Sequence, residues 1–215
     1  MSTTGKDDTR LLELLNSRLC HDLVGTVSAI NNGLELLSEF GDQMDGEAGD
    51  LVMRSAAAAA HALQFYRLAF GFAGGDDAMQ PIHALQELTR NFLAREKIEA
   101  NWDGNVVAEA ALPNRQAKLL LNTVLLAIEA LPRGGEIAIA LEGGDSPTAM
   151  RVAANGQDAG LRPEIRSALS ADARVDELTP RSAQAYYTVR LSSQIDADLS
   201  INSEQDRVEF AAKLG

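Results

Sequence analysis

The sequence predicts an α+β protein, with an N-terminal helical hairpin followed by a C-terminal two-layer α/β sandwich. Two long stretches near the N-terminus repeat apolar side chains every three or four positions, as amphipathic helices do. Later in the chain, short helical patterns alternate with strand-like runs that are separated by Gly and Pro. We therefore expect a hairpin domain over residues 1–75 and a sandwich domain over residues 82–215.

The hairpin is expected to consist of two antiparallel helices. The first begins near residue 9 and ends near Phe40, and the second extends from Val52 to Phe70, before the glycines within 71–75. Three glycines and several acids over 41–49 predict the turn between them. The apolar stripe of the first helix consists of Leu12, Leu15, Leu19, Leu23, Val27, Ile30, Leu34 and Leu37.

The second helix carries more apolar surface than one partner helix can cover. Phe65, Leu68 and Phe72 lie on the side away from its first stripe. Pairing with the same hairpin of another subunit would bury them in a dimeric four-helix bundle with a two-fold axis. Packing against the second domain of the same chain is the alternative. We favour the homodimer, because two helices alone cannot bury both faces.

The sandwich is predicted from the mixture of short helices and strands beyond a linker at 74–81. The expected elements are a helix over 82–92, an extended segment over 98–107, a helix over 113–131, strands over 136–141 and 149–153, helices over 163–169 and 183–195, and strands over 199–201 and 208–214. Helices and antiparallel strands in this order favour a two-layer α+β sandwich.

The composition limits the classes of function. The 215-residue chain has 19 basic and 31 acidic residues, for a net charge of -12, which would repel a nucleic-acid backbone. Its single cysteine, Cys20, cannot form an internal disulfide, and the sequence shows neither an apolar run of about 18 residues nor a secretion signal. We therefore expect a cytoplasmic protein that binds neither nucleic acid nor membrane.

His21 is the most informative residue of the first helix. At about 100° per residue, it falls almost opposite the apolar stripe. The other members of its face are small or polar, namely Ser17, Gly25, Ser28 and Asn32. The imidazole is therefore expected to stand in water, where its free nitrogen suits it to metal ligation, proton transfer or attack on phosphorus.

Phosphoryl acceptance fits this histidine best. Metal ligation would need a second ligand three or four residues further on, but Val24 and Gly25 stand there. Acid–base catalysis would need a pocket, which the convex face of a helix lacks. A phosphoryl acceptor needs an accessible nitrogen, a nearby carboxylate such as Asp22 to orient the ring or take its proton, and a partner that brings phosphate and metal. We predict that His21 is the nucleophile and that Asp22 assists it.

A docking partner would contact the face around His21. By helical spacing, the docking residues of the first helix are Ser17, Arg18, Gly25, Ser28 and Asn32. Gln64 and Arg67 of the second helix would flank this face, since a basic side chain near the acceptor helps to hold a dianionic phosphoryl group. A solvated helix face is the alternative for these two residues.

Two segments of the first helix resemble known phosphorylation sites. His21-Asp22-Leu23, with Ile30 and Glu35-Leu36-Leu37, resembles the H-box of histidine-kinase dimerisation domains, whose common form is His-Glu-Leu-x-x-Pro. The sequences CHDLVG and AINNGLELL are more closely similar to ChpT-type histidine phosphotransferases. Thr26 stands where these proteins usually carry proline, and Gly25 stands where many bifunctional kinases carry the Thr or Asn used for phosphatase activity. Because Gly25 lacks the side chain used for phosphatase activity, we do not expect this protein to dephosphorylate a partner.

The same resemblance covers the second half of the chain and implies a degenerate kinase ATPase domain. The sequence LLLNTVLLAIEALPRGGEIAI resembles the N-box and the following Gly-Gly hairpin, with Asn122 retained. Leu126 replaces the second Asn, which binds magnesium, and Ala154 in VAANGQDAG replaces the Asp that binds adenine. TPRSAQAYYTV has no glycine where kinases have a glycine-rich lid. We therefore expect neither ATP nor another cofactor.

The function implied by the resemblance is a two-component phosphorelay. His21 would pass a phosphoryl group between receiver-domain aspartates, with Mg²⁺ bound by the receiver. The implied partners are the receiver domain of a hybrid histidine kinase and response regulators, CckA- and CtrA-like, in cell-cycle regulation. Two alternatives stay open: a divergent ATP-dependent histidine kinase, and a non-enzymatic dimeric adaptor or kinase inhibitor.

Overall fold

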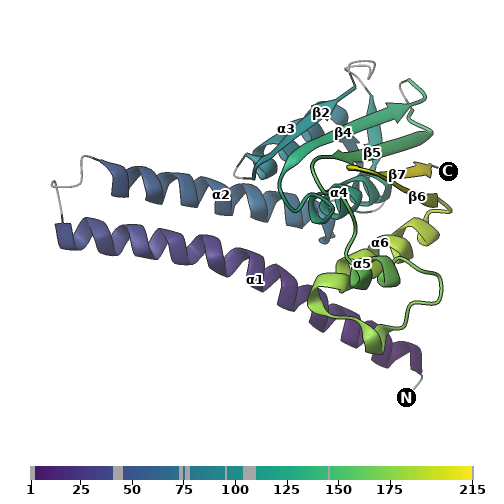
Figure 1. Cartoon of the computed structure of the whole chain (residues 1–215), viewed down its shortest axis with the longest axis horizontal. Helices are drawn as coiled ribbons and strands as arrows, with labels where there is room; N and C mark the ends of the chain where they lie inside the picture. Colours follow the sequence, from purple (N-terminus) through teal and green to yellow (C-terminus); the bar gives the residue numbers. More distant parts are fainter. Residues whose placement is uncertain are drawn as a thin grey trace.

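The computed structural model begins with a long helical hairpin (Figure 1). It describes residues 3–40, 46–72, 75, 78–94, 96–103, 110–144 and 146–214. Helix α1 spans Thr3–Phe40 and helix α2 spans Glu47–Ala69, and the two lie side by side as predicted. Most of the predicted turn at 41–49 lies outside the described residues.

The two helices approach closely near the tip of the hairpin. A Cβ atom on Gly33 of α1 would lie 2.6 Å from Cγ2 of Val52 in α2, so only glycine permits this approach. Gly46, which precedes α2, has a φ of 81°, a conformation that glycine adopts without strain. Gly33 therefore allows the two helices to pack tightly, and Gly46 allows the backbone conformation at the start of α2.

The sandwich comprises a five-stranded sheet with helices on one face. The sheet order is β2-β4-β5-β7-β6, and the strands span Ile98–Trp102 (β2), Gly135–Glu142 (β4), Ala149–Asn155 (β5), Asp198–Glu204 (β6) and Arg207–Lys213 (β7). The helices are α3 (Ile82–Leu93), α4 (Asn114–Glu129), α5 (Pro163–Ala168) and α6 (Pro180–Gln194), with a 3₁₀ turn, η2, at Val175–Glu177. The predicted α+β class and two-layer arrangement are confirmed.

Three details of the sandwich differ from the prediction. Strand β2 pairs in parallel with β4, because the chain crosses between them through α4, whereas antiparallel strands were expected. The predicted linker at 74–81 ends in a strand, β1 (Met79–Pro81), which pairs with β3 (Ala111–Pro113). The extended segment expected over 98–107 is a strand only as far as Trp102, and residues 104–109 lie outside the described part.

The packing of α2 corrects the argument for a partner subunit. Phe65 is fully buried and stacks on Phe92 of α3, with ring centroids 4.0 Å apart. Leu68 is also buried within the chain, and Phe72 is exposed. The alternative, packing against the second part of the same chain, is therefore right for Phe65 and Leu68.

A different face of the hairpin exposes large apolar side chains. On α1 these belong mainly to the predicted stripe, and on α2 they lie between the predicted turn and the sandwich. They are Leu12, Val27, Leu34 and Leu37 on α1, and Met53 and Leu63 on α2; Val24 of α1 is also exposed, outside the stripe. In the described part of the chain, no helix is both long and apolar enough to cross a membrane.

The hairpin and the sandwich are joined at several points. Leu14 and Leu15 of α1 are buried in the common core. The Nδ2 atom of Asn122 in α4 donates a hydrogen bond to the carbonyl of Ala69 at the end of α2, at 2.8 Å. These contacts place the sandwich beside the first half of α1, which carries His21.

Candidate functional site

His21 lies on the surface of α1, with 89% of its side chain exposed. The predicted exposure of the imidazole is confirmed. Helix α1 continues without interruption past Thr26, whose Oγ1 donates to the carbonyl of Asp22 at 3.5 Å. Thr26 keeps the backbone N–H that proline would lack, so the ring is presented from a continuous helix.

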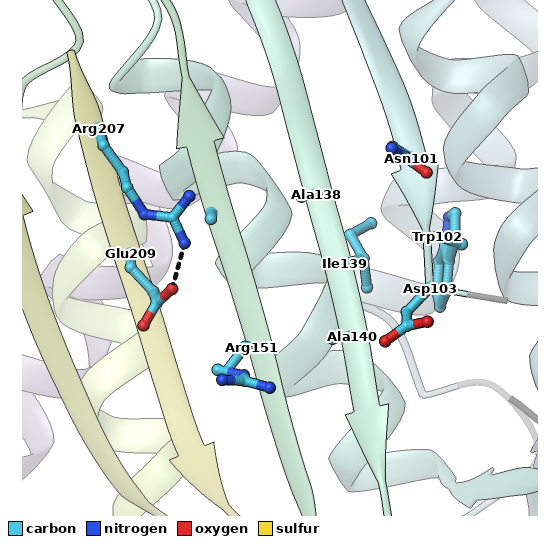
Figure 2. Close-up of a pocket in the computed structure, with 10 residues that line it drawn as sticks. Asn101, Trp102, Asp103, Ala138, Ile139, Ala140, Arg151, Arg207 and Glu209 are labelled. Carbon is cyan, nitrogen blue, oxygen red and sulfur yellow. Dashed lines mark hydrogen bonds and ion pairs between the residues drawn. The ribbon is translucent and has the colours of Figure 1, made fainter. Parts of the chain in front are cut away.

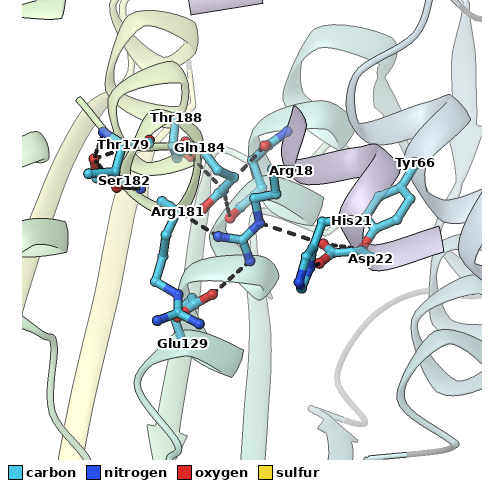
Figure 3. Close-up of polar contacts among 11 residues, drawn as sticks. Arg18, His21, Asp22, Tyr66, Glu129, Thr179, Arg181, Ser182, Gln184 and Thr188 are labelled. Atoms are coloured by element: carbon cyan, nitrogen blue, oxygen red, sulfur yellow. Dashed lines mark hydrogen bonds and ion pairs between the residues drawn. The ribbon is translucent and has the colours of Figure 1, made fainter. Parts of the chain in front are cut away.

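The Asp22 carboxylate is held between His21 and the interior (Figure 3). Its Oδ1 lies 3.4 Å from Nδ1 of His21. Its Oδ2 accepts a hydrogen bond of 3.0 Å from the hydroxyl of Tyr66 in α2 and lies 3.6 Å from Nε of Arg18. Only 25% of the Asp22 side chain is exposed, so this acid is far more buried than the imidazole that it contacts.

An ion-pair network behind these residues connects three helices. Nη2 of Arg18 lies 2.7 Å from Oε1 of Glu129 at the end of α4, and Nη1 donates to the carbonyl of Arg181 at 3.0 Å. Nε of Arg181, in α6, lies 3.8 Å from Oε2 of the same glutamate. Since both Arg18 and Glu129 are mostly buried, this network fixes α6 against α1.

The start of α6 is defined by a capping box. The Thr179 side chain accepts from the backbone N–H of Ser182, and Oγ of Ser182 accepts from the backbone N–H of Thr179. Pro180 occupies the first helical position, where its fixed φ suits the helix. The predicted helix at 183–195 therefore begins three residues earlier, and the extra turn holds Arg181 near His21.

A pocket of about 450 Å³ lies beside the imidazole. Its walls come from α1 on one side and from the sandwich on the other, which corrects the expectation that the convex helix face offers no pocket. It is lined by Ser17, Arg18, His21, Asp22, Glu129, Glu164, Thr179, Pro180 and Arg181. A shallow groove of about 480 Å³ continues along the hairpin and is lined by Asp22, Gly25, Thr26, Ala29, Arg54, Ser55 and Ala58.

The predicted docking residues are only partly brought together. Ser17 and Arg18 line the pocket that contains His21, and Gly25 lines the adjoining groove. Ser28 and Asn32 are exposed further along α1, while Gln64 and Arg67 are exposed on α2 and line neither hollow. Their roles in docking stay predictions.

An aromatic cluster supports the site from behind. The ring of Tyr66 packs against Phe65, Phe70 and Phe92, with centroid separations of 6.1, 6.0 and 5.5 Å. Phe70 also contacts Tyr187 of α6 at 5.6 Å, and burial raises the pKa of the Tyr187 hydroxyl. The cluster joins α2 to α3 and α6, so its rings fix the position from which the Tyr66 hydroxyl reaches Asp22.

The residues that resemble part of a nucleotide site are buried. Asn122 is fully buried, and its Nδ2 donates to the carbonyls of Ala69 and Lys118. Nε2 of Gln184 in α6 lies 2.9 Å from the carbonyl of Asn122. Leu126 and Ala154 are also fully buried and carry no side-chain oxygen or nitrogen. These residues do not fit a nucleotide with its magnesium ion.

Another hollow, of about 440 Å³, lies on the open face of the sheet (Figure 2). Its two arginines are already paired: Arg151 with Glu142, and Arg207 with Glu209 and Asn155. Figure 2 shows the helices on the other side of the strands. This hollow is therefore separated from His21 by the sheet and its helical layer.

Comparisons with known proteins identify the family of the chain. Residues 82–207 match the family model for the histidine phosphotransferase C-terminal domain. The chain is 36% identical to the protein phosphotransferase ChpT of Brucella abortus (strain 2308) over 200 residues, or 93% of each protein. It is also similar to a solved bacterial phosphotransferase structure, with a TM-score of 0.82, 34% identity, and coverage of 99% of this chain and 98% of the other. This chain therefore belongs to the ChpT-type histidine phosphotransferase family.

Proposed function

We propose that this phosphotransferase relays a phosphoryl group between receiver-domain aspartates through His21, without using ATP. The observation that carries the proposal is the exposed imidazole whose Nδ1 lies against the Asp22 carboxylate. An imidazole that bears its proton on Nδ1 keeps a lone pair on Nε2, which then faces an incoming phosphate.

In the first half-reaction, Nε2 of His21 attacks the phosphorus of a receiver aspartyl phosphate. An N–P bond forms as the bond from phosphorus to the aspartyl oxygen breaks, and the electron pair returns to the receiver carboxylate. The imidazole becomes positively charged, and Asp22 stabilises that charge through Nδ1–H. The second half-reaction is the reverse, toward the aspartate of another receiver.

The receivers are proposed to dock over the pocket beside His21 and the groove that adjoins it. The donor is the receiver domain of a hybrid histidine kinase, and the acceptors are response regulators. Mg²⁺ belongs to the receiver, where it offsets the charge of the phosphoryl group during transfer. Docking of this kind supplies the orientation that the reaction requires.

ATP is not proposed as a phosphoryl source. The closed packing between α4 and α6 supports this view, because Gln184 occupies the position next to Asn122 and Leu126 offers no ligand for magnesium. Opening this region for a nucleotide would expose buried apolar surface, which is unfavourable.

A homodimer is proposed on the basis of the exposed apolar face of the hairpin. Leu34 is 51% exposed and Leu63 is 55% exposed. Full burial of a leucine side chain stabilises a protein by about 1.5–3 kcal/mol, so covering these residues would be favourable. On the helical wheel of α1, the exposed residues Leu12, Val27, Leu34 and Leu37 fall on the side opposite His21. A second hairpin on this side would complete a four-helix bundle and leave both imidazoles accessible.

The test supplies the purified protein with two phosphoryl sources in separate reactions. A receiver domain phosphorylated on aspartate should transfer label to the wild-type chain and not to His21→Ala, whereas labelled ATP with Mg²⁺ should transfer none. Stable labelling by ATP would instead identify a histidine kinase. Equal behaviour of wild type and His21→Ala with the receiver would identify a non-enzymatic adaptor.

A further inference from the structure

Tyr66 is the buried partner of the carboxylate that contacts His21. Its hydroxyl donates to Oδ2 of Asp22 at 3.0 Å, and Oδ1 of the same carboxylate faces Nδ1 of His21. The Tyr66 ring is itself buried among aromatic rings, one of which, Phe92, belongs to α3 of the sandwich. The hydroxyl therefore acts from a buried position, whereas the imidazole is exposed to water.

The helix alone does not bring Asp22 to His21. Adjacent residues of a helix diverge by about 100°, while residues four apart lie on the same face, so the ordinary partner of Asp22 on α1 is Arg18. The structure places Oδ2 3.6 Å from Nε of Arg18, longer than the contact with Tyr66. With Oδ2 held by the tyrosine, Oδ1 is left directed toward the imidazole.

We propose that Tyr66 is a positioning residue for phosphotransfer. Its hydroxyl holds Asp22 so that Oδ1 accepts Nδ1–H of His21, which selects the tautomer with a free Nε2. Because the Tyr66 ring is packed by Phe92, the sandwich contributes to the reaction by fixing this hydroxyl. The inference rests on the proposed phosphotransfer through His21 and adds a residue that neither contacts phosphate nor docks a receiver.

The test removes one hydroxyl and keeps the ring. Tyr66→Phe preserves the aromatic packing, Asp22→Asn removes the charge next to His21, and Tyr187→Phe removes a hydroxyl from another ring of the same cluster. For each variant, the rate of transfer from a saturating phosphorylated receiver, the affinity for that receiver, and the ¹⁵N shifts of the His21 ring are measured. Circular dichroism and thermal unfolding show whether each variant is folded.

We expect Tyr66→Phe to slow transfer about three- to tenfold, as for the loss of one ordinary hydrogen bond, with unchanged receiver affinity. The ¹⁵N shifts should show a smaller fraction of the Nδ1–H tautomer. Tyr187→Phe should match wild type in rate and ring shifts. Tyr66→Phe combined with Asp22→Asn should be no slower than Asp22→Asn alone, because both changes act on one carboxylate.

Two results would overturn the positioning role while leaving the proposed function intact. One is that Tyr66→Phe transfers phosphate at the wild-type rate although Asp22→Asn transfers it slowly. The other is a slower rate with an unchanged tautomer ratio, which would mean that Tyr66 acts only through packing. Failure of the wild-type chain to accept phosphate, or acceptance by His21→Ala, would instead reject phosphotransfer through His21.

Discussion

Two polar clusters of this molecule have opposite surroundings. At the first, the His21 side chain is 89% exposed and Asp22 anchors it from one side. At the second, Asn122 is fully buried and its amide is bound to carbonyls of two helices. A group that must react with another protein has to remain in water, whereas a buried polar group whose hydrogen bonds are satisfied inside the chain stabilises the fold.

The buried cluster joins the sandwich to the hairpin. Asn122 connects α4 to the end of α2, and Gln184 of α6 fills the space beside it. Glu129, at the end of the same helix α4, binds Arg18 one turn before Asp22. The sandwich thus supports α1 from behind, and the proposed phosphotransfer takes place on the hairpin.

Removing the exposed imidazole should have the largest effect. His21→Ala should lower phosphoryl acceptance from a receiver by about a thousandfold or more, because a lost nucleophile has no substitute on this face. Acid-stable and acid-labile label would be measured after incubation with phosphorylated receiver. His83→Ala, which changes an exposed histidine of α3, is the matched control and should be labelled like wild type. Equal labelling of both variants would contradict the assignment.

Placing charges on the exposed apolar face of the hairpin should have the next largest effect, a change in oligomeric state. Leu34→Glu with Leu37→Glu should convert a dimer into a monomer, because charged side chains would have to be buried between the hairpins. Sedimentation velocity would measure the change over a range of concentrations. Glu35→Gln, next to these leucines and exposed, is the control and should leave the mass unchanged. A wild-type chain that sediments as a monomer would contradict the proposed dimer.

Restoring a polar residue to the closed cluster should be destabilising. Leu126→Asn places an amide among fully buried side chains, at an expected cost of about 3–5 kcal/mol in the free energy of unfolding. Urea denaturation would measure this cost, and calorimetric titration with ATP and Mg²⁺ should detect no binding. Leu126→Met keeps the apolar character and should lose less than about 1.5 kcal/mol. Binding of ATP by the asparagine variant would show that the region is an open nucleotide site.

The sequence predicted the exposure of His21 better than the contacts that hold Asp22 and Arg18 in place. The exposure of His21 follows from helical spacing alone, because one helix determines which face is apolar. The contact between Tyr66 and Asp22 spans 44 residues and that between Arg18 and Glu129 spans 111, so no local pattern indicates them. Tyr66 also fits the apolar spacing of α2, so the pattern alone indicates an ordinary core residue. Only the folded arrangement shows that its hydroxyl faces the site.

The same limit explains the error about α2. Its apolar residues show that Phe65 must be covered, but the pattern does not say whether a partner subunit or the same chain covers it. The stacking of Phe65 on Phe92 answers this question. The strand at Met79–Pro81 was missed for a similar reason, since its hydrogen-bonding partner follows some 30 residues later.

Asn122→Ala gives the smallest effect and separates the two clusters most sharply. The change removes the hydrogen bond to the Ala69 carbonyl, which is expected to cost about 1–3 kcal/mol in the free energy of unfolding. Phosphoryl transfer through His21 should continue at a temperature where the variant is folded, because the amide lies outside the pocket beside the imidazole.

In an active kinase the corresponding residue belongs to the nucleotide site, so the same change would stop the reaction without needing to unfold the protein. Urea denaturation and receiver-dependent labelling, measured on one preparation, distinguish these behaviours. Loss of labelling at unchanged stability would mean that the buried cluster takes part in the chemistry after all.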